Sequence, residues 1–191
     1  MKNFIKYILL LFICSYLTAG ELRPLSMKGF DSINENNIYN RGSYLILVPT
    51  YNNGILESML SNENVGGDFI KFKKSQGYDV FVETITEGMS AQEIKDQIIL
   101  PFYNDNPMLE YVLLIGDANG VIAIPTFTIN SYNEEDIDVT DYPYTFTDNQ
   151  YEPHFFIGRW PIQSMADLIN IKYRSIEYIK KQESISDYSN L

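Results

Sequence analysis

Few side chains in this sequence could catalyse a reaction. The 191 residues include one histidine, His154, and one cysteine, Cys14. Serine–histidine triads and histidine-based metal centres would therefore depend entirely on His154. A lone histidine at the end of a strand is more often packed or hydrogen-bonded than catalytic, and we expect that structural role for His154.

Carboxylates are the other candidates for chemistry. Asp136, Asp138 and Asp141 lie close together in an acidic stretch and could donate oxygens to a calcium ion, which takes about six to eight such ligands. The stretch lacks the glycine and the terminal glutamate of an EF-hand loop. We keep the three aspartates as candidate calcium ligands, with a solvated acidic loop as the alternative, and we expect that the chemistry requires no cofactor.

Asp117 follows an apolar run and is the remaining carboxylate of interest. An aspartate at the end of a buried strand can bind a metal or hold a catalytic base. The alternative is that its carboxylate caps N–H groups of its own loop. The segment from Gly116 to Gly120 lacks the lysine and hydroxyl residue of a phosphate-binding Walker motif and the spacing of a dinucleotide fingerprint. HExxH, CxxC and GxSxG motifs are also absent from the sequence.

Composition and charge exclude further classes. Apolar residues make up 45% of the chain and aromatic residues 14%, which predicts a folded domain rather than a disordered one. The chain has 14 basic and 25 acidic side chains, for a formal charge of −11, which repels phosphate backbones. We therefore expect no nucleic-acid partner.

Residues 1–20 have the layout of a secretory signal peptide. Lys2 and Lys6 precede an apolar stretch, and small residues follow at 18–20. We expect cleavage after Gly20, a secreted protein that is extracellular or at the cell surface, and no stable membrane span after cleavage. The alternative, an uncleaved anchor, has an apolar run shorter than the ~20 residues that a span needs. Cys14 would be removed with the signal, and the exported chain would contain no cysteine.

Short apolar runs predict the strands of the domain. Residues 21–42 read as an extended lead-in, and the pattern changes at Ser43. Runs at 44–48 and 111–115 are typical of strands buried in a parallel sheet, and 79–84 is predicted as a further strand between them.

Helices are expected between and after these strands. One is predicted over 55–74, with an interruption at Gly66-Gly67, and a capping box of Ser90 and Glu93 opens another that runs to about Tyr103. A second capping signal at Ser164 begins a helix near the C-terminus. Alternating strands and helices predict an α/β fold with a mainly parallel sheet covered by helices on both faces.

The segment at 120–150 differs from the rest of the domain. It contains Pro125, Pro143, several aromatic residues and six acidic ones. In an open α/β sheet, functional groups gather outside the carboxyl ends of the strands, and Asp117 and the start of this segment are expected there.

Three blocks of the sequence resemble the gingipain-like cysteine peptidases, family C25. They are EYVLLIGDANGVIAIPT at 110–126, DVTDYPYTFTDN at 138–149 and PHFFIGRWPIQSMADLINIKYRSIEYIKK at 153–181. The resemblance implies a three-layer αβα sandwich, caspase/gingipain-like and incomplete, over residues 43–191. It also implies hydrolysis of peptide bonds by a cysteine thiolate and a histidine at the ends of later strands.

These later strands are not found in the sequence, so we expect an amino-terminal part of the family's domain that is inactive alone. Protein or peptide would be its substrate if downstream sequence completed the domain. His154 stands where the family usually has the acid that orients its catalytic histidine, and Glu152 could substitute by strand alternation. An unpaired sheet edge would leave such a fragment marginally stable or prone to aggregation.

Two other functions remain open. One is a non-catalytic secreted α/β binding module, stabilised by calcium in one version. The other is a metal hydrolase that depends on Asp117.

Overall fold

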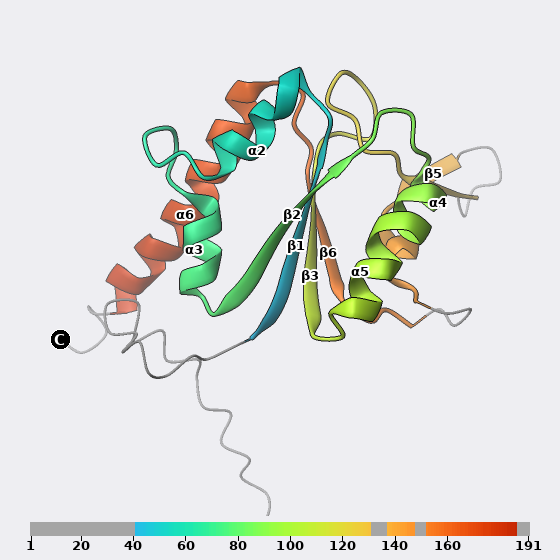
Figure 1. Ribbon diagram of the computed structural model, residues 1–191. Coiled ribbons are helices and arrows are strands. Elements are labelled where there is room, and N and C mark those ends of the chain that lie inside the picture. Colours follow the sequence, from blue (N-terminus) through green and yellow to red (C-terminus); the bar gives the residue numbers. More distant parts are fainter. Residues whose placement is uncertain (1–40, 131–136, 148–151, 187–191) are drawn as a thin grey trace, which may run out of the picture. The chain divides into compact units, whose positions relative to one another are not determined.

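The computed structural model describes residues 41–130, 137–147 and 152–186 (Figure 1). The predicted signal peptide at 1–20 and all but the last two residues of the predicted lead-in at 21–42 lie outside this range. All described elements belong to one compact unit. Within the described residues, no helix combines the length and the apolar character that crossing a membrane requires.

Four parallel strands form the main sheet, in the order β2-β1-β3-β6. Their bounds are Gly42–Pro49 for β1, Tyr78–Ile85 for β2, Leu109–Ile115 for β3 and Phe156–Trp160 for β6. The three strands predicted from apolar runs are thus confirmed. β1 is flanked by neighbours on both sides and buried along almost its whole length, which explains why its sequence is apolar without alternation.

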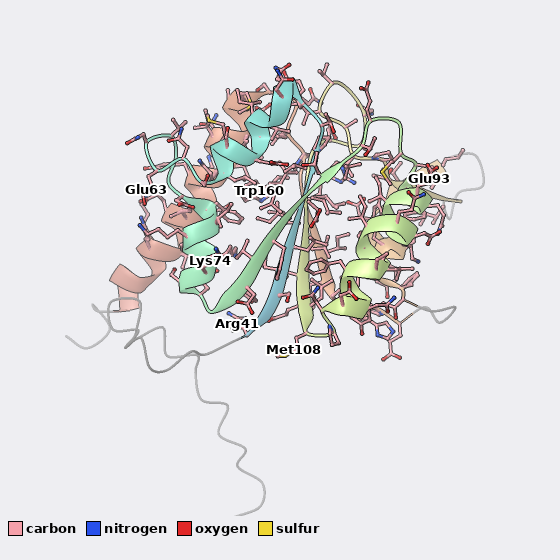
Figure 2. The ribbon with its side chains drawn as sticks, viewed as in Figure 1. Arg41, Glu63, Lys74, Glu93, Met108 and Trp160 are labelled. Carbon is pink, nitrogen blue, oxygen red and sulfur yellow. The ribbon has the colours of Figure 1, made fainter. Side chains whose placement is uncertain are left out.

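One face of the sheet is covered by α2 (Ile55–Leu60), α3 (Phe69–Ser75) and α6 (Met165–Ser186) (Figure 1). Tyr44 and Trp160 belong to the core of this face. Figure 2 shows Trp160 on the side of the sheet that these helices cover, and its ring centroid lies 4.7 Å from that of Phe69. The rings of this face pack in tilted and edge-on pairs, and aliphatic side chains such as Leu56 and Leu60 fill the space around them.

The other face is covered by α4 (Ala91–Ile94), the π-helical turn η2 (Lys95–Ile99) and α5 (Leu100–Asp105). The predicted capping box is present, because Ser90 accepts from the Glu93 N–H and the Glu93 carboxylate accepts from the Ser90 N–H. The path of the helix predicted over 90–103 is confirmed, but it is not regular. Pro101 has no N–H to donate to the preceding turn, and the wider π turn lies directly before it.

The helix predicted over 55–74 is interrupted as expected, and it forms two separate helices, α2 and α3. Gly66 and Gly67 lie between them with φ of +76° and +88°, a left-handed conformation that no helix interior contains. A Cβ on Gly66 would lie 3.0 Å from the carbonyl oxygen of Ile169 in α6. The two glycines therefore let the connecting loop approach α6 closely.

The segment after β3 forms structure that was not predicted. β4 (Phe127–Asn130) and β5 (Ile137–Thr140) pair antiparallel, and the 3₁₀ turn η3 (Tyr142–Thr145) follows. η3 packs on the same face as α4 and α5, where Tyr144 is fully buried. The described chain is thus a three-layer α/β sandwich, with helices on both faces of a parallel sheet.

Candidate functional site at the carboxyl edge of the sheet

The strand order places a topological switch point between β1 and β3. The chain leaves β1 toward β2 on one side and later enters β3 on the other side of β1. In open α/β sheets, binding crevices form at such points, outside the carboxyl ends of the strands. Asp117 follows the end of β3 and Gln163 follows the end of β6, so both lie at this edge.

The Asp117 carboxylate is engaged on both oxygens. Oδ1 accepts a hydrogen bond from the backbone N–H of Ala118 at 2.7 Å, and Oδ2 accepts from Gln163 Nε2 at 2.6 Å. The hydrogen bond from Gln163, followed by that from Ala118 and the nearby charge of Arg159, lowers the pKa of Asp117 below its usual range. The structure therefore shows the loop-capping role for Asp117. Gln163, which the sequence did not single out, adds a tie between the loops after β3 and β6.

Arg159 on β6 organises the segment that follows β3. Its Nε and Nη2 donate to Oδ2 and Oδ1 of Asp141 at 2.8 and 2.7 Å, in the bidentate geometry that suits a guanidinium and a carboxylate. Nη1 donates to the carbonyl oxygens of Gly116 at 2.9 Å and Ile124 at 2.8 Å, and Nη2 approaches the Pro125 oxygen at 3.4 Å. The side chains of Arg159 and Asp141 are only 12% and 20% exposed. We call this group the Arg159 clamp.

Tyr144 fastens the same segment from inside the core. Its hydroxyl donates to the Pro125 oxygen at 2.7 Å, and its ring packs edge-on against Phe127 with centroids 4.9 Å apart. Burial raises the pKa of the Tyr144 hydroxyl, so the group stays a neutral donor. Together with the Arg159 clamp, Tyr144 holds an irregular segment against the sheet.

The three candidate calcium ligands are not brought together in the described residues. Asp136 lies outside them, Asp138 is an exposed residue of β5, and both oxygens of Asp141 accept hydrogen bonds from Arg159. A cation bound to Asp141 would lie beside the Arg159 guanidinium, which opposes it. The described part of the chain contains no group of three potential ligands, and the calcium site, which includes Asp136, stays a prediction.

His154 lies at the opposite edge of the sheet. β3 and β6 pair from Tyr111 with Phe156 to Ile115 with Trp160, so His154 precedes the paired region whereas Asp117 follows it. The Nδ1 atom of His154 is 3.3 Å from the hydroxyl of Tyr103, and its backbone N–H donates to the Thr145 oxygen at 3.1 Å.

The expected structural role of His154, a hydrogen-bonded imidazole near a strand end, agrees with these contacts. Glu152 and His154 both precede β6, which begins at Phe156. The two residues are therefore not on a strand, and strand alternation does not align their side chains.

Comparison with known proteins gives one finding about the family. A protein-family model described as Peptidase family C25 matches residues 39–190, a range that includes every described strand and helix. No curated protein and no solved structure matches the chain. The family model covers Asp117, Asp141, Arg159 and Gln163, the residues that organise the carboxyl edge.

Proposed function

Because the chain belongs to peptidase family C25, we propose that it forms the amino-terminal part of the catalytic domain of a secreted cysteine endopeptidase. The observation that carries this proposal is the family match over the whole four-stranded sheet. The parallel sheet and its helical layers supply the frame on which such a site is built. Proteins or peptides are the substrates, and the bond hydrolysed is the peptide bond.

The chemistry requires a set of groups that residues 21–191 do not supply. Attack on a peptide carbonyl needs a thiolate, an imidazole that accepts and returns its proton, and donors for the developing oxyanion. Residues 21–191 include no cysteine, and His154 lies at the wrong edge of the sheet. We propose that the thiol and the base stand on strands outside this sequence, and that residues 21–191 alone do not hydrolyse peptide bonds.

A peptidase assay tests this proposal. Purified residues 21–191 are incubated under reducing conditions with a denatured protein and with a mixed library of fluorogenic peptides. No hydrolysis above the buffer rate is expected, with or without a thiol-alkylating reagent. Hydrolysis that the reagent abolishes would contradict inactivity of the chain alone. Sequencing the DNA downstream of the Leu191 codon tests completion, because the proposal expects an open frame with a histidine and then a cysteine at strand ends.

A non-catalytic secreted binding module is the second candidate. The absence of cysteine from residues 21–191 favours it, since a binding module needs no thiol. If calcium stabilises this module, the melting temperature of the purified chain should fall when calcium is chelated and recover when calcium is restored. A stop codon directly after Leu191, together with export of the short chain, would favour this module over the peptidase.

A further inference from the structure

Two Asn-Gly pairs lie at the carboxyl edge of the sheet. Asn53-Gly54 follows β1 and Asn119-Gly120 follows β3, the two strands that flank the switch point. Both asparagine side chains are exposed. The same short sequence therefore occurs twice at one edge, in two different local structures.

Asn-Gly pairs can rearrange without an enzyme. The backbone nitrogen of the glycine attacks Cγ of the asparagine side chain, a new C–N bond closes a succinimide ring, and ammonia leaves. Water then opens the ring to give aspartate or isoaspartate, so water is the only co-reactant. Glycine favours the attack because it has no Cβ to hinder the approach and its backbone reaches many conformations.

The structure opposes this reaction at Asn53. Asn53 has φ of 55° and ψ of 42° inside the 3₁₀ turn η1 (Asn52–Gly54), and the nitrogen of Gly54 donates to the Tyr51 oxygen at 3.2 Å. Gly54 leads directly into α2, whose Leu56 is buried in the core. For the nitrogen of Gly54 to attack, this hydrogen bond must break and the start of α2 must move.

The loop that contains Asn119 sets no such obstacle. Among the described residues, neither Asn119 nor Gly120 has a hydrogen-bond partner. Gly120 has φ of +96° with open space around the position of a Cβ, and Val121 is 80% exposed. The loop is anchored on either side of this tip, because the N–H of Asp117 donates to the Ile122 oxygen at 2.9 Å. Rearrangement at Asn119 therefore leaves the anchored base of the loop in place.

We propose that Asn119 is a site of spontaneous deamidation, which places a new carboxylate two residues from Asp117 at the carboxyl edge. The product carries one more negative charge, and its isoaspartate form lengthens the backbone by one methylene group. Charge at this edge thus becomes a function of the age of the molecule. A second carboxylate beside Asp117 disfavours anionic groups and favours cationic ones at the switch point.

Timed peptide mapping of the intact chain tests the proposal. The purified protein is held in mildly alkaline buffer, digested at intervals, and analysed by mass spectrometry for conversion at Asn53 and at Asn119. Conversion at Asn119 is expected to be about fivefold faster, the rate ratio that corresponds to the net free energy of the one hydrogen bond holding the Gly54 nitrogen. Equal rates at the two sites, or faster conversion at Asn53, would overturn the proposal.

Matched variants and a peptide control sharpen the result. Asn119→Gln should abolish most of the ammonia released and most of the methyl acceptance that isoaspartyl methyltransferase detects, whereas Asn53→Gln should change both only slightly. A free peptide with the sequence of residues 116–122 reports the rate without structure. Conversion of Asn119 in the folded chain within a few-fold of that peptide supports an unprotected site. Strong protection relative to the peptide refutes it.

Discussion

The two faces of the sheet are closed in different ways. The face under α2, α3 and α6 is packed with aromatic and aliphatic side chains, and Lys172 of α6 donates to the carbonyl oxygens of Met59 and Asn62 where α2 ends. The face under α4 and α5 is also covered by Ile124, Phe127 and Tyr144, which belong to the described stretches at 116–130 and 137–147. Much of these stretches is irregular, and Arg159 donates to three of their carbonyl oxygens as well as to Asp141. On both faces a cationic side chain reaches the carbonyl groups of irregular backbone or of a helix end, and the face with more irregular cover has the larger set of such hydrogen bonds.

Removing the Arg159 clamp should have the largest effect. Arg159→Ala leaves a mostly buried Asp141 carboxylate and the carbonyl oxygens of Gly116 and Ile124 without this donor. Breaking a buried ion pair in this way costs about 3–5 kcal/mol, and urea unfolding followed by circular dichroism measures the loss.

An exposed arginine provides the control for the loss of stability in Arg159→Ala. Arg174 is exposed on α6, and Arg174→Ala should change the free energy of unfolding by less than about 0.5 kcal/mol. Arg159→Lys keeps the charge but loses the planar fork, and should recover only part of the stability. A loss below about 1 kcal/mol for Arg159→Ala would show that the segment is held mainly by apolar packing.

On the opposite face, adding a methyl group should be nearly as costly. At Gly66, a Cβ would approach the Ile169 oxygen at 3.0 Å and the Lys172 Cε at 3.2 Å, and φ is +76°. Left-handed strain and overpacking together predict a loss of about 2–4 kcal/mol for Gly66→Ala. Gly88 has a similar φ of +87° with nothing near the position of a Cβ, so Gly88→Ala should lose only about 1 kcal/mol. Equal losses in thermal unfolding would mean that the contact with α6 adds nothing.

A smaller, pH-dependent effect is expected at Lys73, on the face of the sheet that α2, α3 and α6 cover. Burial lowers the pKa of Lys73 from 10.5 to about 8, although its ammonium lies 5.0 Å from the centroid of the Tyr44 ring. Because the folded-state pKa is the lower one, the folded state releases this proton first. The contribution of Lys73 to stability should therefore rise as the pH increases from about 8 to 10.5.

Lys73→Met removes that rise. Linkage over the full interval corresponds to about 3 kcal/mol, and the contact of the charged form with the Tyr44 ring reduces it. The difference in unfolding free energy between wild type and Lys73→Met should therefore shift by about 1–3 kcal/mol in favour of the wild type across this pH window, as measured by urea titrations at its two ends. The exposed neighbour provides the control, and Lys74→Met should leave the pH dependence of the wild type intact. If the difference in unfolding free energy does not change with pH, the Lys73 ammonium is solvated in the folded protein and burial does not lower its pKa.

The smallest effect is expected at His154. Its side chain is exposed, and Tyr103 is its neighbour through both the hydroxyl contact and the edge-on ring contact. His154→Ala should change the melting temperature very little, corresponding to less than about 0.5 kcal/mol, and Tyr103→Phe should do the same. If His154→Ala instead lowers the unfolding free energy by several kcal/mol, the contacts of His154 at the amino edge contribute to stability as strongly as the cores of the two faces.

Local patterns in the sequence predicted most of the sheet and its helices. Ser90 with Glu93 opens α4, and at the start of α6 the Ser164 hydroxyl donates to Asp167 and accepts from its N–H. Such capping signals depend on residues three apart, which a sequence displays directly.

The Arg159 clamp could not be predicted in this way. Arg159 and Asp141 both lie in the sequence segments that resemble family C25. Their pairing, however, depends on how β6 and η3 pack together, and the periodicity of the sequence contains no signal of that packing. β4 and β5 were missed because each is only four residues long, and their exposed side chains lack a buried alternating face. The sequence thus predicts elements that local rules define, while the carboxyl edge follows from tertiary contacts.

The position of β1 has a consequence for biosynthesis. Among the described strands β1 is made first, yet it lies between β2 and β3, and both of these partners are translated later. Until they emerge, the apolar sequence GSYLILVP has neither its hydrogen-bonding neighbours nor its covering helices. Pairing of distant parallel strands is slow, and an apolar strand that waits for it is exposed to aggregation. A chaperone that holds the nascent chain would therefore act first on the strand that ends up best protected.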